Sequence, residues 1–284
     1  MEPTNPDALL PAAMARRAEA VGVAKAEMPA LRMFVLAVLA GAFISFGAAF
    51  ATVATTGAEA RLGFGPTRVV GGVAFSLGLV LVVVGGAELF TGNNLLVMAW
   101  VSRRVRARAV LRNWAIVYAG NFVGALGVAG LVFASGQYRG AKGAVGRAAV
   151  ETASAKASLD LGSAFVRGIL ANVLVCLAVW LCFSARSVTD KVLAIVLPIT
   201  AFVAMGFEHS VANMYFLPLG LLVKGAAPDG FWVESGVTAA EFPDLTWGAF
   251  LLDNLVPVTL GNLVGGALLV GLVYAFVYLR GSDG

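Results

Sequence analysis

The sequence predicts an all-α membrane protein whose six transmembrane helices form two inverted three-helix repeats, with the second and fifth helices broken. The first observation behind this prediction is composition: the 284 residues are 60% hydrophobic and only 13% charged, whereas soluble domains carry about 25% charged residues. The second is that six apolar stretches match one another pairwise along the chain. This composition argues against a soluble enzyme and against a disordered chain. The modest net charge of +4 gives no reason to expect nucleic acid as a partner.

Six stretches are apolar enough to cross a bilayer, which takes about 20 residues. The second and fifth would measure about 45 Å or more as single helices, against a hydrocarbon core of about 30 Å. A glutamate within a small, polar patch interrupts each of them, Glu88 in the second and Glu208 in the fifth. Non-helical backbone at membrane depth is tolerated where it lines a cavity or is buried in protein, so we expect two broken helices whose halves are too short to span alone. The six stretches are residues 33–58, 69–102, 113–138, 168–185, 192–223 and 254–279.

Two domains are expected along the chain. We expect residues 1–30 to form a cytoplasmic N-terminal amphipathic segment and residues 31–280 to form the transmembrane domain, with repeats over 31–135 and 163–280. Residues 8–28 mix Leu, Ala and Val with three basic residues, a pattern typical of a helix on a membrane surface and equally of a solvated helix. The start lacks the basic-then-apolar pattern of a signal peptide.

The distribution of Lys and Arg predicts the orientation of the helices. Residues 103–112 hold five arginines and no acid, which favours the cytoplasmic side. With six spans, both termini are then cytoplasmic as well. Residues 224–247 hold one lysine and four acids, which suits the outer side. Residues 139–167 are basic on the predicted outer side and argue against this orientation, but they form a longer connection that also contains two acids.

An internal repeat relates the two halves of the chain. The broken segments match at an offset of 120 residues, as Gly-x-Glu-x4-Asn at 86–93 and 206–213. The third and sixth stretches match at an offset of 141, as Asn-x3-Val-x2-Gly-Asn-x-Val-Gly at 113–124 and 254–265, and the first and fourth match weakly at 131. Three spans per repeat force the halves into opposite orientations, and paired broken helices place a substrate path near the midplane. The Gly-x3-Gly pairs within the second match predict close helix packing.

Polar residues within the apolar stretches are the candidates for function. His209 is the only histidine; an ionisable group inside a membrane is by default a functional candidate, and its titration range suits proton exchange with a weak acid. Glu88 and Glu208 occupy equivalent repeat positions. Their carboxylates either transfer protons or accept hydrogen bonds from backbone N–H groups that lose their helical partners at the breaks. We favour the second interpretation, because both repeats need the break but only one has a histidine. Thr91 and Asn172 are suited to bind either a small anion or a neighbouring helix.

Five bulky apolar residues pack by default and equally suit a narrow apolar gate. The two cysteines lie six residues apart in one stretch, a spacing that predicts neither a disulfide nor a metal pair. The sequence contains no zinc-ligand spacing, P-loop or Gly-x-Ser-x-Gly elbow, so we expect no cofactor, no metal and no enzyme chemistry. The five gate candidates are Phe75, Leu79, Leu89, Phe90 and Phe202.

At these residues the sequence resembles the formate/nitrite transporter family, over about residues 30–280. The most specific segments are Glu-Leu-Phe-Thr-Gly-Asn at 88–93, the run from Gly-Ile-Leu-Ala-Asn to Cys-Leu-Ala-Val-Trp at 168–180, and Gly-Phe-Glu-His-Ser-Val-Ala-Asn-Met at 206–214. The resemblance implies an aquaporin-like protomer in a homopentamer within a bacterial-type cytoplasmic (inner) membrane. It also implies one pore per protomer and a small monovalent anion as cargo.

The resemblance further implies a role for individual residues. Thr91 would lie in the loop that interrupts the second helix and face His209 across the pore. Asn172 would line the pore, and Lys156 would draw anions toward the vestibule. Glu208 would correspond to the residue that the family has next to the histidine. The apolar constrictions would be formed by Phe75, Leu79, Leu89, Phe90, Val175 and Phe202.

A weak acid explains why such a pathway would need both a basic residue and an apolar slit. Desolvation penalises a bare anion heavily and raises its basicity, so an anion drawn in by Lys156 would take up a proton in the slit. His209 would donate or accept that proton, directly or through water and Thr91. In the alternative, anions are conducted as such and His209 only donates a hydrogen bond; the sequence leaves both open. The expected partners are formate, protons, membrane lipid and further copies of the chain.

Nitrite, hydrosulfide and short-chain carboxylates are alternative cargoes within the same family. A neutral-solute channel of the aquaporin type is a rival of a different class. Such channels normally carry Asn-Pro-Ala at both breaks, where this chain carries Gly-x-Glu.

Overall fold

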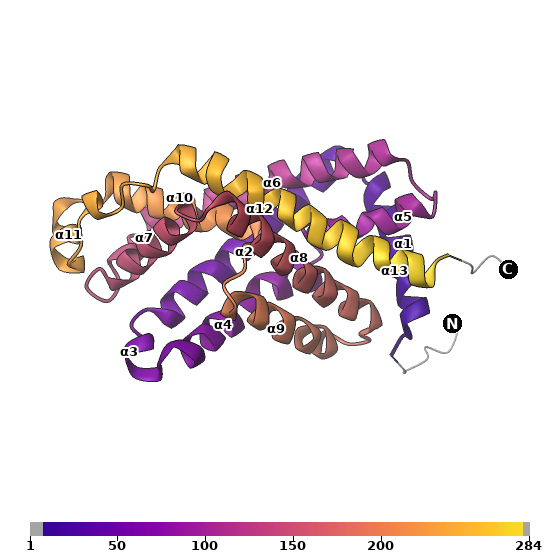
Figure 1. Ribbon diagram of the computed structural model, residues 1–284, viewed down its shortest axis with the longest axis horizontal. Helices are drawn as coiled ribbons and strands as arrows, with labels where there is room; N and C mark the ends of the chain where they lie inside the picture. Colours follow the sequence, from indigo (N-terminus) through magenta and orange to yellow (C-terminus); the bar gives the residue numbers. More distant parts are fainter. Residues whose placement is uncertain (1–7, 281–284) are drawn as a thin grey trace.

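The computed structural model describes residues 8–280, which form helices and connecting loops without a strand (Figure 1). Five helices of this part are long and apolar enough to cross a membrane. The last is continuous but built from α-helical and π-helical segments. The five are α2 (Ala30–Thr55), α4 (Phe64–Gly85), α6 (Ala107–Ala134), α8 (Leu161–Ser184) and the helix formed by η4 (Ala249–Leu255), α12 (Val256–Leu263), η5 (Val264–Leu272) and α13 (Val273–Tyr278).

The first predicted break follows α4. The helix ends at Gly85, and the chain turns at Gly86, whose φ of 77° lies in the left-handed region that glycine adopts without strain. The short helices η1 (Gly92–Leu96) and α5 (Val97–Val101) continue after the break. One part of the prediction is wrong: α4 has 22 residues and is long enough to span alone, because it begins at Phe64, ahead of the stretch expected from the sequence.

The second predicted break separates α9 (Val188–Ala204) from α10 (Ser210–Ala226). Each has 17 residues, about 25 Å of helix, so here both halves are short as expected. The chain turns between them at Gly206, with a φ of 71°. α10 and α11 (Asp229–Ser235), bent by 114°, together also reach the length and hydropathy of a span. Since α11 is charged and short, α9 and α10 supply the sixth crossing.

Glycines set the packing within each repeat, as the Gly-x3-Gly pairs predict. α6 lies against α2, and α12 with η5 lies against α8. A Cβ on Gly124 would come 2.0 Å from the carbonyl oxygen of Val38, and one on Gly265 would come 2.1 Å from that of Ile169. The two repeats then meet where α4 packs on α9 and α6 on α10.

The N-terminal helix α1 (Pro11–Glu27) packs against protein along one side. Its small face, with Ala15, Ala18 and Gly22, is buried or in close contact, and it lies against α5, η1 and α8. The second repeat begins with a corresponding helix, α7 (Ala144–Ala157). α1 also contacts α13, so both ends of the described chain lie at one end of the molecule (Figure 1).

Side-chain caps fix where two of the helices begin. Asp160 caps α8 by accepting from the backbone N–H of Ser163 at 2.9 Å. Hydrogen bonds from the side chain and then the backbone of Ser163 lower the pKa of the exposed Asp160 carboxyl. Ser187 and Asp190 form a reciprocal capping box at the start of α9. Four short elements complete the described part: α3 (Glu59–Leu62), η2 (Gln137–Arg139), α11 (Asp229–Ser235) and η3 (Ala239–Glu241).

Candidate functional site

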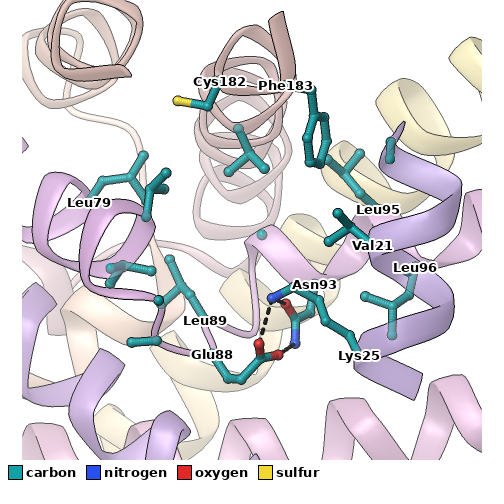
Figure 2. Close-up of a pocket in the computed structure, with 18 of the residues that line it drawn as sticks. Val21, Lys25, Leu79, Glu88, Leu89, Asn93, Leu95, Leu96, Cys182 and Phe183 are labelled. Carbon is teal, nitrogen blue, oxygen red and sulfur yellow. Dashed lines mark hydrogen bonds and ion pairs between the residues drawn. The ribbon is translucent and has the colours of Figure 1, made fainter. Parts of the chain in front are cut away.

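Two cavities of about 280 Å³ each lie toward opposite ends of α4. The first, which we term the α1 cavity, lies between α1, the end of α4, the first break and the end of α8 (Figure 2). The second, the α7 cavity, lies between α7, the first half of α4, the second break and the start of α10. Because the repeats are inverted, the two cavities are equivalent parts of the two halves and lie on opposite sides of the protein.

An apolar barrier lies between these cavities. Leu79 and Leu89 line the α1 cavity, whereas Phe75 and Phe202 line the α7 cavity. All four are at most 3% exposed. Phe75 and Leu79 are one turn apart on α4, and the rings of Phe75 and Phe202 meet edge to face with centroids 5.5 Å apart. The structure therefore brings together four of the six residues expected at the constrictions.

The other two expected constriction residues are buried beside this barrier. The Phe90 ring packs edge to face on Tyr118 of α6, with centroids 4.9 Å apart, and on Trp114. Val175 is 2% exposed on α8. Among the described residues, neither is part of the lining of the two cavities.

A polar pair joins the two breaks at the barrier. His209 precedes α10, is 2% exposed and lines the α7 cavity. Its Nε2 lies 2.9 Å from Oγ1 of Thr91, which follows the first break. The backbone N–H of Ala212 donates to its Nδ1 at 3.1 Å. Because Nδ1 accepts, the proton of a neutral ring resides on Nε2 and is donated to Thr91.

A lysine, a glutamate and two asparagines form a network at the second break. Lys156 Nζ donates to Oε1 of Glu208 at 2.8 Å, and Asn213 donates to Oε2 at 2.7 Å. Asn213 also donates to Asn254, whose amide donates to the carbonyl oxygen of Lys156 at 2.9 Å. The network thus anchors the last residues of α7 to the break and to the start of the last membrane helix.

The first break carries a corresponding network, which the sequence did not lead us to expect; here the lysine, Lys25, also donates to Oδ1 of Asn93 at 2.8 Å. Lys25 Nζ donates to Oε1 of Glu88 at 2.8 Å, and Asn93 donates to Oε2 at 2.7 Å. Figure 2 shows these three side chains. Asn113 donates to the carbonyl oxygen of Lys25. A signal was present: Lys25 precedes Lys156 by 131 residues, the offset that relates the first and fourth stretches. The similarity therefore extends into the N-terminal segment.

The expected role of the two glutamates needs correction. Their carboxylates accept from lysine and asparagine side chains and not from backbone N–H groups of the breaks. Instead, Asn121 and Asn262 hold the broken backbone. Asn121 donates to the carbonyl oxygens of Glu88 and Ala37, and Asn262 donates to those of Glu208 and Gly168.

Asn172 lies at the centre of the helix packing. Its side-chain amide donates to Oδ1 of Asn94 at 2.8 Å and to the carbonyl oxygen of Asn262 at 2.7 Å, with a longer contact of 3.4 Å to the carbonyl oxygen of Thr91. It is fully buried. These contacts link α8 to both repeats and use the amide protons of Asn172. The geometry therefore favours hydrogen bonding to neighbouring helices over binding of a small anion.

Each cavity carries an excess of positive charge. Lys25, Arg17 and Lys191 line the α1 cavity together with Glu88. The α7 cavity repeats this pattern with Lys156, Arg68, Arg167 and Glu208. Arg68 and Arg17 also bind the last carbonyl groups of a helix, Arg68 at the end of α9 and Arg17 at the end of α8, where a cation is favoured. Both cavities therefore suit a small anion.

The sequence profile of formate/nitrite transporters matches residues 12–276. The chain belongs to the formate/nitrite transporter family. A curated relative, formate channel FocA of Escherichia coli K12, is 48% identical over 284 residues, covering 100% of this chain and 99% of FocA. The probable formate transporter of Methanothermobacter thermautotrophicus is 37% identical and covers 95% and 97% of the two chains.

Solved structures of the family share the fold. A pentameric formate channel with formate bound superposes with a TM-score of 0.84 at 42% identity, covering 88% of this chain and 98% of the channel. An FNT family ion channel superposes with a TM-score of 0.77 at 27% identity. The chain is thus a multi-pass membrane protein of an anion-transporting family, and its named relatives are channels or transporters. Within the described residues no group of three or more His, Cys, Asp or Glu is placed to hold a metal ion.

Proposed function

We propose that the protein carries formate across a bacterial inner membrane, through one pathway in each protomer of a homopentamer. The pathway runs from the α1 cavity past the apolar barrier and the pair formed by His209 and Thr91 into the α7 cavity. The observation that carries this proposal is that two positively charged cavities of matched construction lie on either side of an apolar barrier, beside the pair of His209 and Thr91. The names of the relatives, and the pentameric assembly of one of them, support formate and the homopentamer.

The proposed orientation places the α1 cavity on the cytoplasmic side. The connection after α5, with five arginines in residues 103–112, lies at the same end as α1, because Arg104 pairs with Glu19 at 3.5 Å. Excess Lys and Arg on that end predicts the cytoplasmic side. Both chain termini then lie in the cytoplasm. Because Lys25 lines the α1 cavity, we assign α1 to the transport pathway as well as to the N-terminal segment.

Attraction and desolvation act in sequence on the substrate. Three cations in each cavity raise the local concentration of a small anion. At the barrier the anion loses water among side chains that are at most 3% exposed, and desolvation raises its affinity for a proton. It takes up a proton that reaches it from the bulk solution through the cavity, and it passes the barrier as the neutral acid. The opposite cavity, which is again wet and positively charged, favours the anion and releases the proton.

His209 aids this exchange by hydrogen bonding. In the observed geometry Nδ1 accepts from Ala212, so protonating the ring at Nδ1 would break that bond. We therefore propose that the ring stays neutral and that its Nε2–H, shared with Thr91, turns to a carboxyl oxygen of the substrate during passage. The bond from Ala212 therefore supports a role for His209 as a hydrogen-bond donor rather than as an imidazolium that gives its proton to the substrate. His209→Asn keeps a side-chain N–H donor without a titratable group.

Uptake into proteoliposomes at several pH values tests the function. Wild-type protein should take up formate with protons, so that an opposing pH gradient stops uptake. Nitrite and hydrosulfide measured alongside rank the alternative cargoes. Glycerol flux without formate flux would instead indicate a neutral-solute channel. His209→Asn should lower the rate yet keep the pH profile; loss of proton coupling with flux retained would show that the imidazole itself transfers the proton.

A further inference from the structure

A groove separate from the two cavities lies at the end of the molecule that holds α1 and α13. Its volume is about 740 Å³. Three arginines line it: Arg16 from α1, Arg104 from the connection after α5, and Arg280, two residues after the end of α13. All three are exposed. Among the described residues, Glu19 is the only acid in the lining. Its carboxylate lies 3.5 Å from Nη1 of Arg104, so these four residues carry two positive charges in excess.

Apart from Ser102, the remaining described wall of this groove is apolar. Val101, Leu272 and Phe276 contribute to it, and Phe276 is 61% exposed. The apolar surface continues along the same spanning helix through further exposed side chains such as Val273. The guanidinium of Arg280 lies 5.2 Å from the ring centroid of Phe276. The basic end of the groove thus passes directly into an exposed apolar face of the last membrane helix.

We propose that this groove binds an anionic phospholipid. Its headgroup phosphate would accept hydrogen bonds from Arg16, Arg104 and Arg280, and its acyl chains would lie along Phe276 and the face of α13. A guanidinium binds phosphate oxygens in a fork geometry, and basic residues next to a membrane helix attract anionic headgroups. A soluble phosphate would use the arginines but gain nothing from the apolar wall, which is why the groove favours a lipid.

The groove joins three segments that are distant in sequence. Bound lipid would bridge the start of α1, the connection after α5 and the end of α13. Because the same α1 carries Lys25 into the α1 cavity, lipid in the groove should stabilise the docked position of this helix. The melting temperature of the protein is therefore a second measurement that tests the proposal, besides lipid binding itself.

Native mass spectrometry of the detergent-purified, full-length protein tests the proposal with two probes, dioleoyl phosphatidylglycerol and dioleoyl phosphatidylcholine. Phosphatidylglycerol should bind in preference and raise the melting temperature. A triple variant with Arg16→Gln, Arg104→Gln and Arg280→Gln should weaken its binding by about fivefold per arginine lost. Glycerol 1-phosphate at the same concentration should not compete.

The matched control removes three arginines of the neighbouring connection, Arg103, Arg106 and Arg108, none of which lines the groove. This variant carries the same change in net charge and should keep phosphatidylglycerol binding. Equal weakening in both triple variants would overturn the proposal, because binding would then reflect only diffuse charge. Competition by glycerol 1-phosphate would reassign the groove to a soluble phosphate. A change of oligomeric state in the groove variant without lipid preference in the wild type would reassign it to a neighbouring copy of the chain.

Discussion

Lys156→Gln tests the proposed attraction of the substrate anion into the α7 cavity. The change removes an ammonium that lies 2.8 Å from Glu208 on the wall of a cavity of about 280 Å³. Within such a cavity an anion stays on the order of 8 Å from this ammonium, and an effective dielectric constant of about 40 gives an attraction of about 1 kcal/mol. That corresponds to about a fivefold rise in the half-saturating formate concentration. The maximal rate should change less, because the barrier is untouched.

The same substitution also breaks a buried ion pair. Glu208 has a 4% exposed side chain and would keep only Asn213 as a donor; losing one partner of such a pair costs about 3–5 kcal/mol. The double variant Lys156→Gln with Glu208→Gln separates the two effects. It removes the unpaired charge and restores the cavity's original excess of two positive charges. Stability and half-saturation should therefore both return toward wild-type values.

Initial rates of formate uptake into proteoliposomes, measured over a range of formate concentrations, provide the assay, with thermal unfolding measured on the same samples. Lys142→Gln is the matched control, since Lys142 is exposed just before α7 and does not line the cavity. It should leave the half-saturating concentration unchanged. An unchanged half-saturating concentration in Lys156→Gln itself would refute the electrostatic reasoning. A fivefold rise in the half-saturating concentration that persists in the double variant would show that formate depends on direct contact with Lys156 and not on the net charge of the cavity.

Three further predictions test the inverted repeat, the packing and a cap. Lys25→Gln should raise the half-saturating concentration for transport from the α1 side by about fivefold without affecting transport from the other side, as oriented vesicles can show; equal effects from both sides would contradict the assignment of the cavities. Gly124→Ala should destabilise by about 1–3 kcal/mol or more, because its Cβ would come 2.0 Å from a carbonyl oxygen. Gly127→Ala on the same helix meets nothing within 4 Å and should be neutral or stabilising, so equal melting temperatures would contradict the packing. Hydrogen bonds from the side chain and backbone of Ser163 lower the pKa of Asp160, so the stabilisation that this helix cap provides is present above the unfolded-state pKa and is lost as pH falls through the lowered native pKa. Asp160→Ala should accordingly lower the melting temperature at neutral pH, and the difference from wild type should shrink below about pH 4.

The sequence by itself determined the six crossings, the two breaks and the repeat. Hydropathy, glycines and the glutamate-centred patches are local signals, and order along the chain sufficed to infer that the halves are inverted. The glycine pairs at 120/124 and 261/265 similarly predicted close packing between helices. The pairing of Thr91 with His209 was expected only from the family resemblance, since no local pattern relates residues 118 positions apart.

Only the tertiary structure decided which polar side chains meet. It placed Lys25 of the N-terminal helix against Glu88, gave the amide protons of Asn172 to protein acceptors, and turned Phe90 toward α6. The physical reason is that buried polar groups must find partners, and in this chain those partners come from other helices and often from the opposite repeat. Such contacts depend on how the two halves pack, which no single segment specifies.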